Sequence, residues 1–281
     1  MPTLRIADVD LEYTCTGRGE PLVLIHGLGS SGKDWERQVR AFAERYRVIT
    51  FDLRGHGASS KPAGPYSIAE LAHDTSLLMN GLHAEPAYVV GVSLGGMIAL
   101  QLTLDRPDLV RRLVIVNSAP AVVPRGLRQH GALLLRRATL ELFGLDAMGR
   151  VIGKRLFPRP DQVGLRAEFR ERWRQNEQVA YRAALEAIVG WSVSDRLSSL
   201  RCPTLVVSGD RDYTPVAYKQ QYMQLIPNAE LAVIADSGHG TPIDQPEAFN
   251  VAVLAFLTGS RGGSGAAPAW DPTREMAATT R

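Results

Sequence analysis

Cysteine, long apolar runs and excess charge are all scarce in this sequence, and each shortage narrows what the protein can be. Only two cysteines occur in 281 residues, Cys15 and Cys202, and they do not form a CxxC pair. Cysteines this few and this far apart argue against a disulfide framework and against a zinc site. We therefore expect both to be reduced, small core residues.

The chain also lacks the signals of secretion, membrane insertion and nucleic-acid binding. Its start, MPTLRIADVDLEYTCTG, has no cationic segment followed by an apolar one, so we expect no signal peptide. No apolar run approaches the ~20 residues of a membrane span. Lysine and arginine total 32 against 29 aspartate and glutamate, too even a balance to indicate nucleic-acid binding. We expect a cytoplasmic protein that binds neither nucleic acid nor membranes. Nothing in the sequence indicates its oligomeric state.

Short apolar runs bounded by turn residues recur along the chain. Because runs of this length, rich in β-branched residues, fit strands buried on both faces, they predict a mainly parallel sheet. The expected strands are Leu4–Ile6, Val9–Tyr13, Pro21–Ile25, Arg47–Phe51, Ala87–Val90, Arg112–Val116, Thr204–Val207 and Glu230–Ile234.

Helical segments alternate with these strands. Alternating strands and helices indicate an open α/β sheet with helices on both faces. Ligand sites in such sheets lie at the carboxyl ends of the strands, so we expect the chemistry at this edge. Apolar residues recur at helical spacing in Trp35–Tyr46, Ile68–Leu82, Leu94–Asp105, Val216–Ile226 and Pro246–Leu257.

One interval breaks the alternation. Residues 121–193 contain no good strand run but show helical patterns at Gly131–Phe143 and Val179–Val189. We predict that they form a helical cap over the carboxyl edge of a core domain made of residues 1–120 and 194–259. Residues 260–281 are rich in Gly, Ala, Pro and Thr and have little to bury, which predicts a mobile tail.

The segment Gly91-Val92-Ser93-Leu94-Gly95 carries the strongest local signal. It matches G-x-S-x-G, follows an expected strand and opens an expected helix, which is the context that this motif requires. The sharp turn exposes the Ser93 hydroxyl at a helix N-terminus, where developing negative charge is favoured. Ser93 is therefore the candidate nucleophile, with an incidental serine in a glycine-rich packing turn as the alternative.

A serine nucleophile needs a base, because a free hydroxyl is a poor nucleophile at neutral pH. Among the six histidines, His239 lies in a glycine-flanked loop just after the last expected strand. The base needs an orienting acid, and Asp210 and Asp212 both follow the strand Thr204–Val207 at the same edge. The chain order serine, aspartate, histidine fits a catalytic triad on an α/β sheet, with either aspartate as the acid.

An oxyanion hole requires two N–H groups aimed at the charge that develops in the transition state. Leu94, the residue after the nucleophile, supplies one. The other is expected from the loop His26-Gly27-Leu28-Gly29-Ser30, where glycines let the backbone approach a substrate closely, and Leu28 is the candidate.

Taken together, these residues resemble the α/β-hydrolase superfamily. The likeness runs over about residues 22–256 and is carried by HGLGSSGKDW, DLRGHGASS, GVSLGG, GDRDYTP and DSGHGTPIDQPEAF. It implies the α/β-hydrolase fold, with a mostly parallel eight-stranded sheet, a cap and a Ser-Asp-His triad. The usual G-x-x-D spacing falls on Gly209 and Asp212, so the resemblance implies Asp212 as the acid. Asp210 is then expected to bond backbone or Arg211.

The resemblance also implies roles for residues near the site. In DLRGHG, Asp52, Arg54 and His56 are expected to brace the loops around the active site, and His26 is expected to hold the oxyanion loop in place. None of them is the expected base.

For function, the resemblance implies a serine hydrolase that cleaves a small carboxylic ester or lactone through an acyl-enzyme, with no metal or organic cofactor. GVSLGGMIAL resembles the corresponding turn of enol-lactone hydrolases, whereas the HWAQWE-like pattern of carbon–carbon bond hydrolases is absent around His239. A carbon–carbon hydrolase, a lyase or a cofactor-free perhydrolase stays open as an alternative. A non-catalytic ligand receptor also stays open, although intact Ser93, Asp212 and His239 speak against it.

Overall fold

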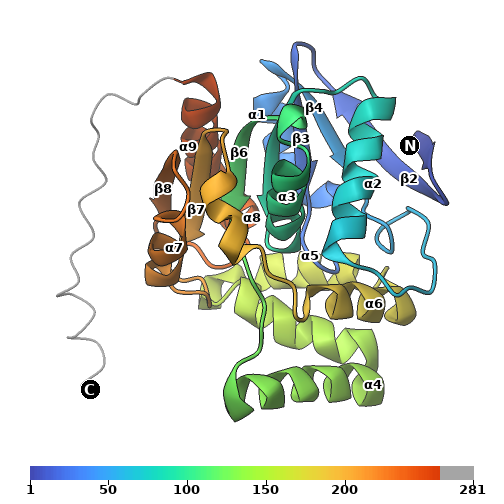
Figure 1. Cartoon of the computed structure of the whole chain (residues 1–281). Helices are drawn as coiled ribbons and strands as arrows, with labels where there is room; N and C mark the ends of the chain where they lie inside the picture. Colours follow the sequence, from blue (N-terminus) through green and yellow to red (C-terminus); the bar gives the residue numbers. More distant parts are fainter. Residues whose placement is uncertain (260–281) are drawn as a thin grey trace.

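The computed structural model describes residues 1–259, which are built around one eight-stranded sheet (Figure 1). The sheet order is β1-β2-β4-β3-β5-β6-β7-β8. The pairs β1–β2 and β2–β4 are antiparallel, and all the others are parallel. This confirms the predicted mostly parallel sheet. The strands are β1 (Thr3–Ile6), β2 (Val9–Thr16), β3 (Glu20–Ile25), β4 (Tyr46–Phe51), β5 (Ala87–Val92), β6 (Val110–Val116), β7 (Thr204–Gly209) and β8 (Ala229–Ile234).

Helices cover both faces of the sheet, as predicted (Figure 1). On one face, α1 (Glu36–Phe42) and α9 (Pro246–Thr258) bury Phe42 and Phe249 against the strands. On the other, α2 (Ile68–Gly81), α3 (Leu94–Asp105) and α7 (Val216–Met223) bury residues such as Leu71, Ile98 and Tyr222. Central strands packed on both faces explain the continuous apolar runs of the sequence.

Three local predictions are wrong. The helix expected over Trp35–Tyr46 is a 3-10 turn at Gly32–Trp35 followed by α1, because Tyr46 already pairs with β3 as the first residue of β4. The helix expected to reach Ile226 ends at Met223. Cys15 is exposed near the end of β2 and Cys202 is only half-buried, so neither is a core residue, although both are free.

Three helices fill the interval between β6 and the 3-10 turn Ser194–Ser199 that precedes β7. They are α4 (Gly126–Leu156), α5 (Val163–Trp173) and α6 (Gln178–Ile188), and they lie together at the carboxyl edge of the sheet (Figure 1). α4 bends sharply at Gly144, whose φ of 69° and ψ of −173° are not helical. We keep the predicted division and call residues 121–193 the cap.

The cap joins the rest of the chain through a short neck. Ala121 and Ser192 form an isolated antiparallel bridge, and the Val122 N–H donates to the Trp191 carbonyl at 2.8 Å. The predicted tail, residues 260–281, lies outside the described residues.

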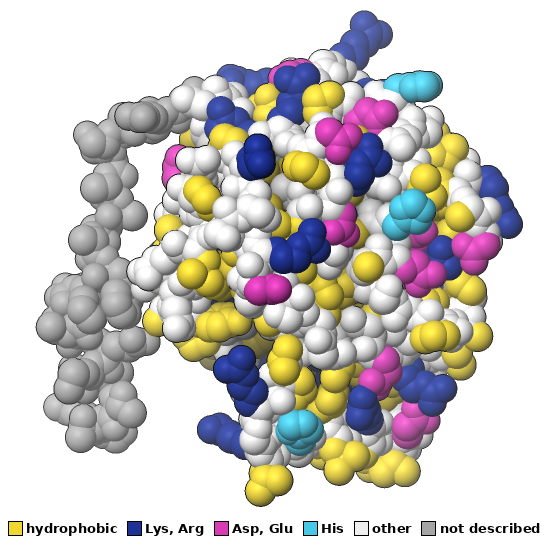
Figure 2. All heavy atoms as spheres, in the orientation of Figure 1, with side chains coloured by type: hydrophobic (Ala, Val, Ile, Leu, Met, Phe, Trp, Pro, Cys, Tyr) yellow, Lys and Arg dark blue, Asp and Glu magenta, His cyan; other side chains and the backbone are white. Residues whose placement is uncertain are grey.

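Large apolar side chains are exposed mainly on the cap. Figure 2 shows them gathered along the lower border of the view, over the cap helices. Within residues 1–259, no helix is both long enough and apolar enough to cross a membrane. The exposed cap residues are Val123, Leu127, Leu134, Leu135, Leu142, Phe143, Val151, Val163 and Val179.

Candidate active site

A cavity of about 1060 Å³ separates the carboxyl edge of the sheet from the cap. Ser93, Tyr213 and His239 line it from the sheet side, and α4 and α5 line it from the cap side. Most lining residues are apolar, as in typical small-molecule sites, and the volume lies at the upper end of the usual ~300–1000 Å³ range. The cavity therefore has room for a substrate larger than a minimal ester.

Ser93 occupies the turn between β5 and α3, with φ of 55° and ψ of −113°. Few residues other than glycine adopt positive φ, so this turn is strained and must be held by its surroundings. A Cβ on Gly91 would lie 2.2 Å from the Gly95 carbonyl oxygen, and one on Gly95 would lie 2.1 Å from that of Ile25. Both glycines of the motif are therefore required for the serine to stand at the head of α3.

The loops after β7 and β8 bring Asp212 and His239 together. His239 Nδ1 lies 2.7 Å from Asp212 Oδ1, and both side chains are almost fully buried. Burial acts to raise the pKa of Asp212, but the hydrogen bond to His239 and the charges of His239 and Lys219 lower it below its usual value. The carboxylate is thus ionised and orients the imidazole.

The other acid of this loop, Asp210, has a different partner. Its Oδ1 accepts the Ser237 N–H at 3.0 Å, so it holds the loop that carries His239. Bonding to backbone is as expected, but Arg211 pairs with Asp236 instead of Asp210.

A buried lysine completes the surroundings of Asp212. Lys219 Nζ on α7 lies 2.5 Å from Asp212 Oδ2 and 2.6 Å from the Thr214 carbonyl oxygen, and neither charged side chain is exposed. Burial lowers the pKa of Lys219, and the Asp212 charge opposes this. The aspartate is therefore held between a histidine on one oxygen and an ammonium on the other.

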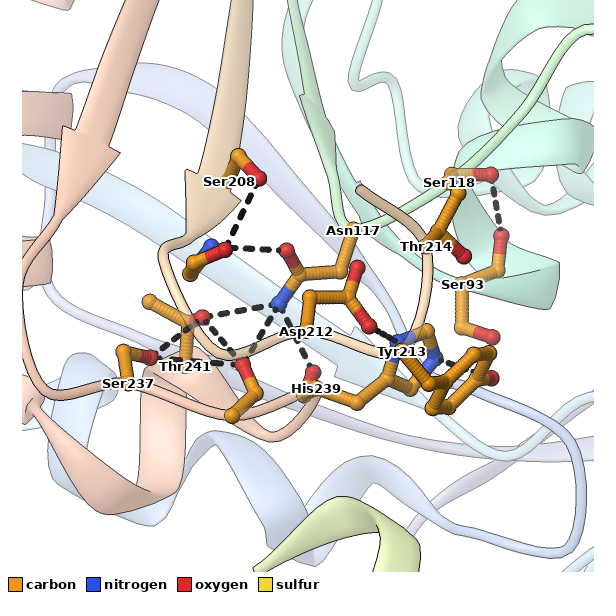
Figure 3. A network of polar contacts seen from close by, with 12 residues as sticks. Ser93, Asn117, Ser118, Ser208, Asp212, Tyr213, Thr214, Ser237, His239 and Thr241 are labelled. Atoms are coloured by element: carbon orange, nitrogen blue, oxygen red, sulfur yellow. Dashed lines mark hydrogen bonds and ion pairs between the residues drawn. The ribbon is translucent and has the colours of Figure 1, made fainter. Parts of the chain in front are cut away.

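The remaining ring nitrogen of His239 bonds to a tyrosine. Tyr213 Oη lies 2.9 Å from His239 Nε2, and the two rings stack with centroids 4.2 Å apart. In Figure 3, the side chains of Ser93, Tyr213 and His239 point toward one another. Tyr213 is 57% exposed, but the protein around its hydroxyl and the Asp212 charge raise the pKa of Tyr213. When the imidazole is neutral with its proton on Nδ1, Nδ1–H donates to the Asp212 carboxylate and Nε2 accepts a hydrogen bond from the Tyr213 hydroxyl.

Asn117 ties the three loops of this edge to one another (Figure 3). It follows β6, is buried, and accepts the Gly209 N–H at 2.9 Å through Oδ1. Its Nδ2 donates to the His239 carbonyl at 2.8 Å and to Thr241 Oγ1 at 2.7 Å. The ends of β6, β7 and the His239 loop are thus fixed by one side chain.

The chain is similar to known proteins in both sequence and fold. A model of the alpha/beta hydrolase fold family matches residues 20–246. The chain belongs to the alpha/beta hydrolase fold family. Its homologues are named as hydrolases, enol-lactonases and esterases, so this family member is an enzyme of the hydrolase class.

Three relatives illustrate the likeness. A protein of Caulobacter sp. (strain K31) named RutD, with carbamate hydrolysis as its provisional activity, is 33% identical over 85% of this chain and 91% of its own length. The 3-oxoadipate enol-lactonase 2 of Acinetobacter baylyi is 30% identical over 91% of this chain and 96% of its own. The structure of an enol-lactonase from Burkholderia xenovorans LB400 superposes with a TM-score of 0.85 at 27% identity, covering 92% of this chain and all of that one.

In this alpha/beta hydrolase, the loop expected to supply an oxyanion donor lies against the nucleophile turn. A Cβ on Gly27 would lie 3.6 Å from Ser93 Cβ, and Leu28 lines the cavity. The cap rests on the same loop, since Asn176 Nδ2 donates to the Gly29 carbonyl at 2.8 Å and the Trp173 ring packs on Gly29. The loop that contains Leu28 thus lies between the nucleophile turn and the cap.

The residues of DLRGHG contact the loops of the hydrolase rather than its cavity. Asp52 accepts the N–H groups of Gly32 at 2.7 Å and Ala58 at 2.8 Å. Arg54 forms a buried ion pair with Asp74 at 2.7 Å. His56 Nδ1 lies 3.0 Å from the Arg54 carbonyl oxygen.

His26 contacts both the oxyanion loop and the segment after β4. Its Nε2 accepts the Leu53 N–H at 3.0 Å, and its Nδ1 lies 2.8 Å from the Gly27 carbonyl oxygen. Burial lowers the pKa of His26 to about 4, so the ring is neutral at pH 7. A neutral ring can accept one bond and donate the other.

Sequence reasoning missed Lys219, Tyr213 and Asn117. Lys219 lies in an ordinary helical segment seven residues after Asp212, and no local pattern marks it as buried. Tyr213 stands in the GDRDYTP motif, next to the acid, and that adjacency was the available signal. Among residues 1–259, no group of three or more His, Cys, Asp and Glu side chains is arranged to hold a metal ion.

Proposed function

We propose that the protein hydrolyses a carboxylic ester or lactone through an acyl-enzyme formed on Ser93. His239 Nε2 takes the proton of Ser93 as Oγ attacks the carbonyl carbon, and Asp212 stabilises the resulting imidazolium. The N–H groups of Leu28 and Leu94 bind the oxyanion. The bond to the leaving oxygen then breaks, and His239 gives the proton to that oxygen.

The second half of the cycle returns the enzyme to its starting state. A water molecule gives a proton to His239 and attacks the acyl carbon, and the acid leaves as Ser93 regains its proton. The observation that carries the proposal is the 2.7 Å bond between His239 Nδ1 and Asp212 Oδ1, with Nε2 at the cavity that Ser93 lines. A base held in this tautomer is what activation of a serine requires.

The Tyr213 hydroxyl has to move away from His239 Nε2 in this mechanism. Its hydroxyl bonds to His239 Nε2 at 2.9 Å, at the atom that must accept the serine proton. We propose that a bound substrate displaces the Tyr213 hydroxyl and lets Nε2 engage Ser93. Its position on the cavity wall puts the ring in the path of an entering substrate.

Relatives support the ester or lactone as substrate, because two of those described are enol-lactonases. The likeness to the RutD protein supports carbamate hydrolysis as a second candidate. The same residues serve it, since the attack, the oxyanion and the proton transfer to the leaving group are alike.

The test uses a serine-directed fluorophosphonate and a panel of esters, lactones, carbamates and 1,5-diketones. We expect one adduct, located on Ser93 by peptide mass spectrometry, and turnover of esters or lactones that is abolished in Ser93→Ala. Labelling elsewhere, or none, would overturn the nucleophile assignment. Turnover of the carbamates or diketones alone would leave Ser93 as the nucleophile but would contradict an ester or lactone as the substrate.

A further inference from the structure

The arginines of the cap differ in their partners. Most of those outside the cavity lining form ion pairs with aspartate or glutamate, as exposed arginines commonly do, whereas in the part of the chain that the structure describes Arg128 has none and Arg166 donates to carbonyl oxygens. Among residues 1–259, no carboxylate pairs with Arg125, Arg136 or Arg155, and all three line the cavity. The paired arginines are Arg137, Arg150, Arg159, Arg170, Arg172, Arg174 and Arg182.

Arg136 is half-buried, whereas Arg155 is exposed. The Nη2 atom of Arg136 donates to Tyr181 Oη at 2.7 Å, and Tyr181 is fully buried. Its Nε is buried and has no hydrogen-bond partner. Buried donors without partners are rare, because each costs free energy that a bound group can recover.

The cavity offers these arginines no anion of its own. Among the described residues that line the cavity, the acidic one is Asp34, which is already paired with Arg172 at 3.1 Å and accepts a bond from Ser30. The positive field also reaches the proposed reaction centre. The protein around the Tyr213 hydroxyl and the Asp212 charge raise the pKa of Tyr213, and the charges of Arg136 and Arg155 oppose that rise.

We propose that Arg136 and Arg155 form an anion-binding subsite on the cap side of the cavity, and that the substrate is an ester or lactone bearing a carboxylate. This inference rests on the proposed function for the reacting carbonyl, which lies at Ser93. A guanidinium edge matches a carboxylate with two parallel N–H donors, and Nε of Arg136 is one donor of such an edge. The substrate carboxylate thus supplies the partner that the protein lacks.

The test compares monomethyl esters of dicarboxylic acids, from succinate to pimelate, with methyl esters of monocarboxylic acids of the same length. We expect wild-type kcat/KM to favour the charged series by about 10- to 100-fold, as for one or two charge-assisted hydrogen bonds. The chain length with the highest kcat/KM reports the span from Ser93 to the guanidinium groups. Equal values for the two series would overturn the proposal.

Substitutions test whether Arg136 and Arg155 cause the preference for the charged series. We expect Arg136→Gln and Arg155→Gln to raise KM for the charged series about tenfold each, with kcat and the neutral series nearly unchanged. The Arg155 side chain makes no hydrogen bond or ion pair within the described chain, so we expect Arg155→Gln to fold normally. The matched control is Arg128→Gln, which removes the same charge from an exposed position of α4 outside the cavity lining. If Arg128→Gln weakened the preference for the charged series as much, the preference would arise from the net charge of the protein, and a defined subsite would be contradicted.

A binding experiment separates this inference from the proposed function. Calorimetry with adipate and the Ser93→Ala protein needs no catalysis. Binding that weakens about tenfold in Ser93→Ala/Arg136→Gln supports the subsite even if no ester is cleaved. Failure to bind any of the dicarboxylates, from succinate to pimelate, would contradict the subsite even if neutral esters are cleaved.

Discussion

The wall of the cavity that the sheet provides differs from the wall that the cap provides in how its polar groups are satisfied. On the sheet side, Asp212 is bonded on both oxygens, and Asn117 bonds to the end of β7 and to the His239 loop. On the cap side, Arg136 keeps a buried donor without a partner, and Arg155 has no partner within residues 1–259. A wall whose polar groups have hydrogen-bond partners within the protein is suited to hold a fixed reaction geometry. A wall with unpaired polar groups is suited to receive a ligand.

The largest expected effect tests whether the sheet wall sets the chemistry. We expect Asp212→Asn to lower kcat about 10⁴-fold on an activated ester, as removal of the triad acid does in serine proteases. The control is Asp210→Asn, which keeps an oxygen for the Ser237 N–H and is expected to lose less than about tenfold. Equal losses would mean that the two acids share one role. Steady-state kinetics measures both.

A second comparison sets a buried ion pair of the sheet wall against an exposed one of the cap. We expect Lys219→Met to lower the free energy of unfolding by about 3–5 kcal/mol, because it leaves the Asp212 charge buried with one partner fewer. Arg182→Gln, which breaks the exposed pair with Glu141, is expected to cost less than about 1 kcal/mol. Urea denaturation measures both, and similar values for the two variants would contradict the contrast between the walls.

The smallest effect is expected at Tyr213, which lies on the sheet wall next to His239. Tyr213→Phe keeps the stacked ring and removes the hydroxyl from His239 Nε2, so a bond of about 1 kcal/mol no longer has to break. We expect kcat/KM to stay unchanged or to rise by up to about fivefold. Tyr218→Phe removes another tyrosine hydroxyl from the cavity lining and serves as the control. A fall of a hundredfold in Tyr213→Phe alone would show that Tyr213 carries the proton instead of moving aside.

Much of the fold was predictable because its strands are buried on both faces. Continuous apolar runs such as Ala87–Val90 then stand out from the amphipathic helices, and α3 begins and ends where the pattern predicts. The error at Tyr46 has a physical cause. An apolar residue at helical spacing is also suited to begin a strand, and pairing with β3 decided the outcome.

The candidate site was predictable only where a motif fixes a backbone shape. The glycines around Ser93 and His239 mark tight loops, which local sequence can reveal. Asn117 acts through partners far along the chain, and Lys219 meets Asp212, seven residues earlier, only because of the path of the loop between them. Whether a cap arginine lines the cavity depends on how its helix packs over the sheet. Such properties arise from packing and leave no local pattern.

The neck between Ala121 and Ser192 has a consequence for how substrate range can change. The cap leaves and re-enters the core at adjacent, hydrogen-bonded positions. The pairing of β6 with β7 therefore does not depend on the length of the chain between them. One contiguous piece of sequence can be transplanted from a relative, or redesigned, provided that the new piece keeps the contacts of the cap to the core loops, such as Asn176 to Gly29 and Arg159 to Asp236. New specificities are therefore accessible by exchange of a module rather than by scattered substitutions.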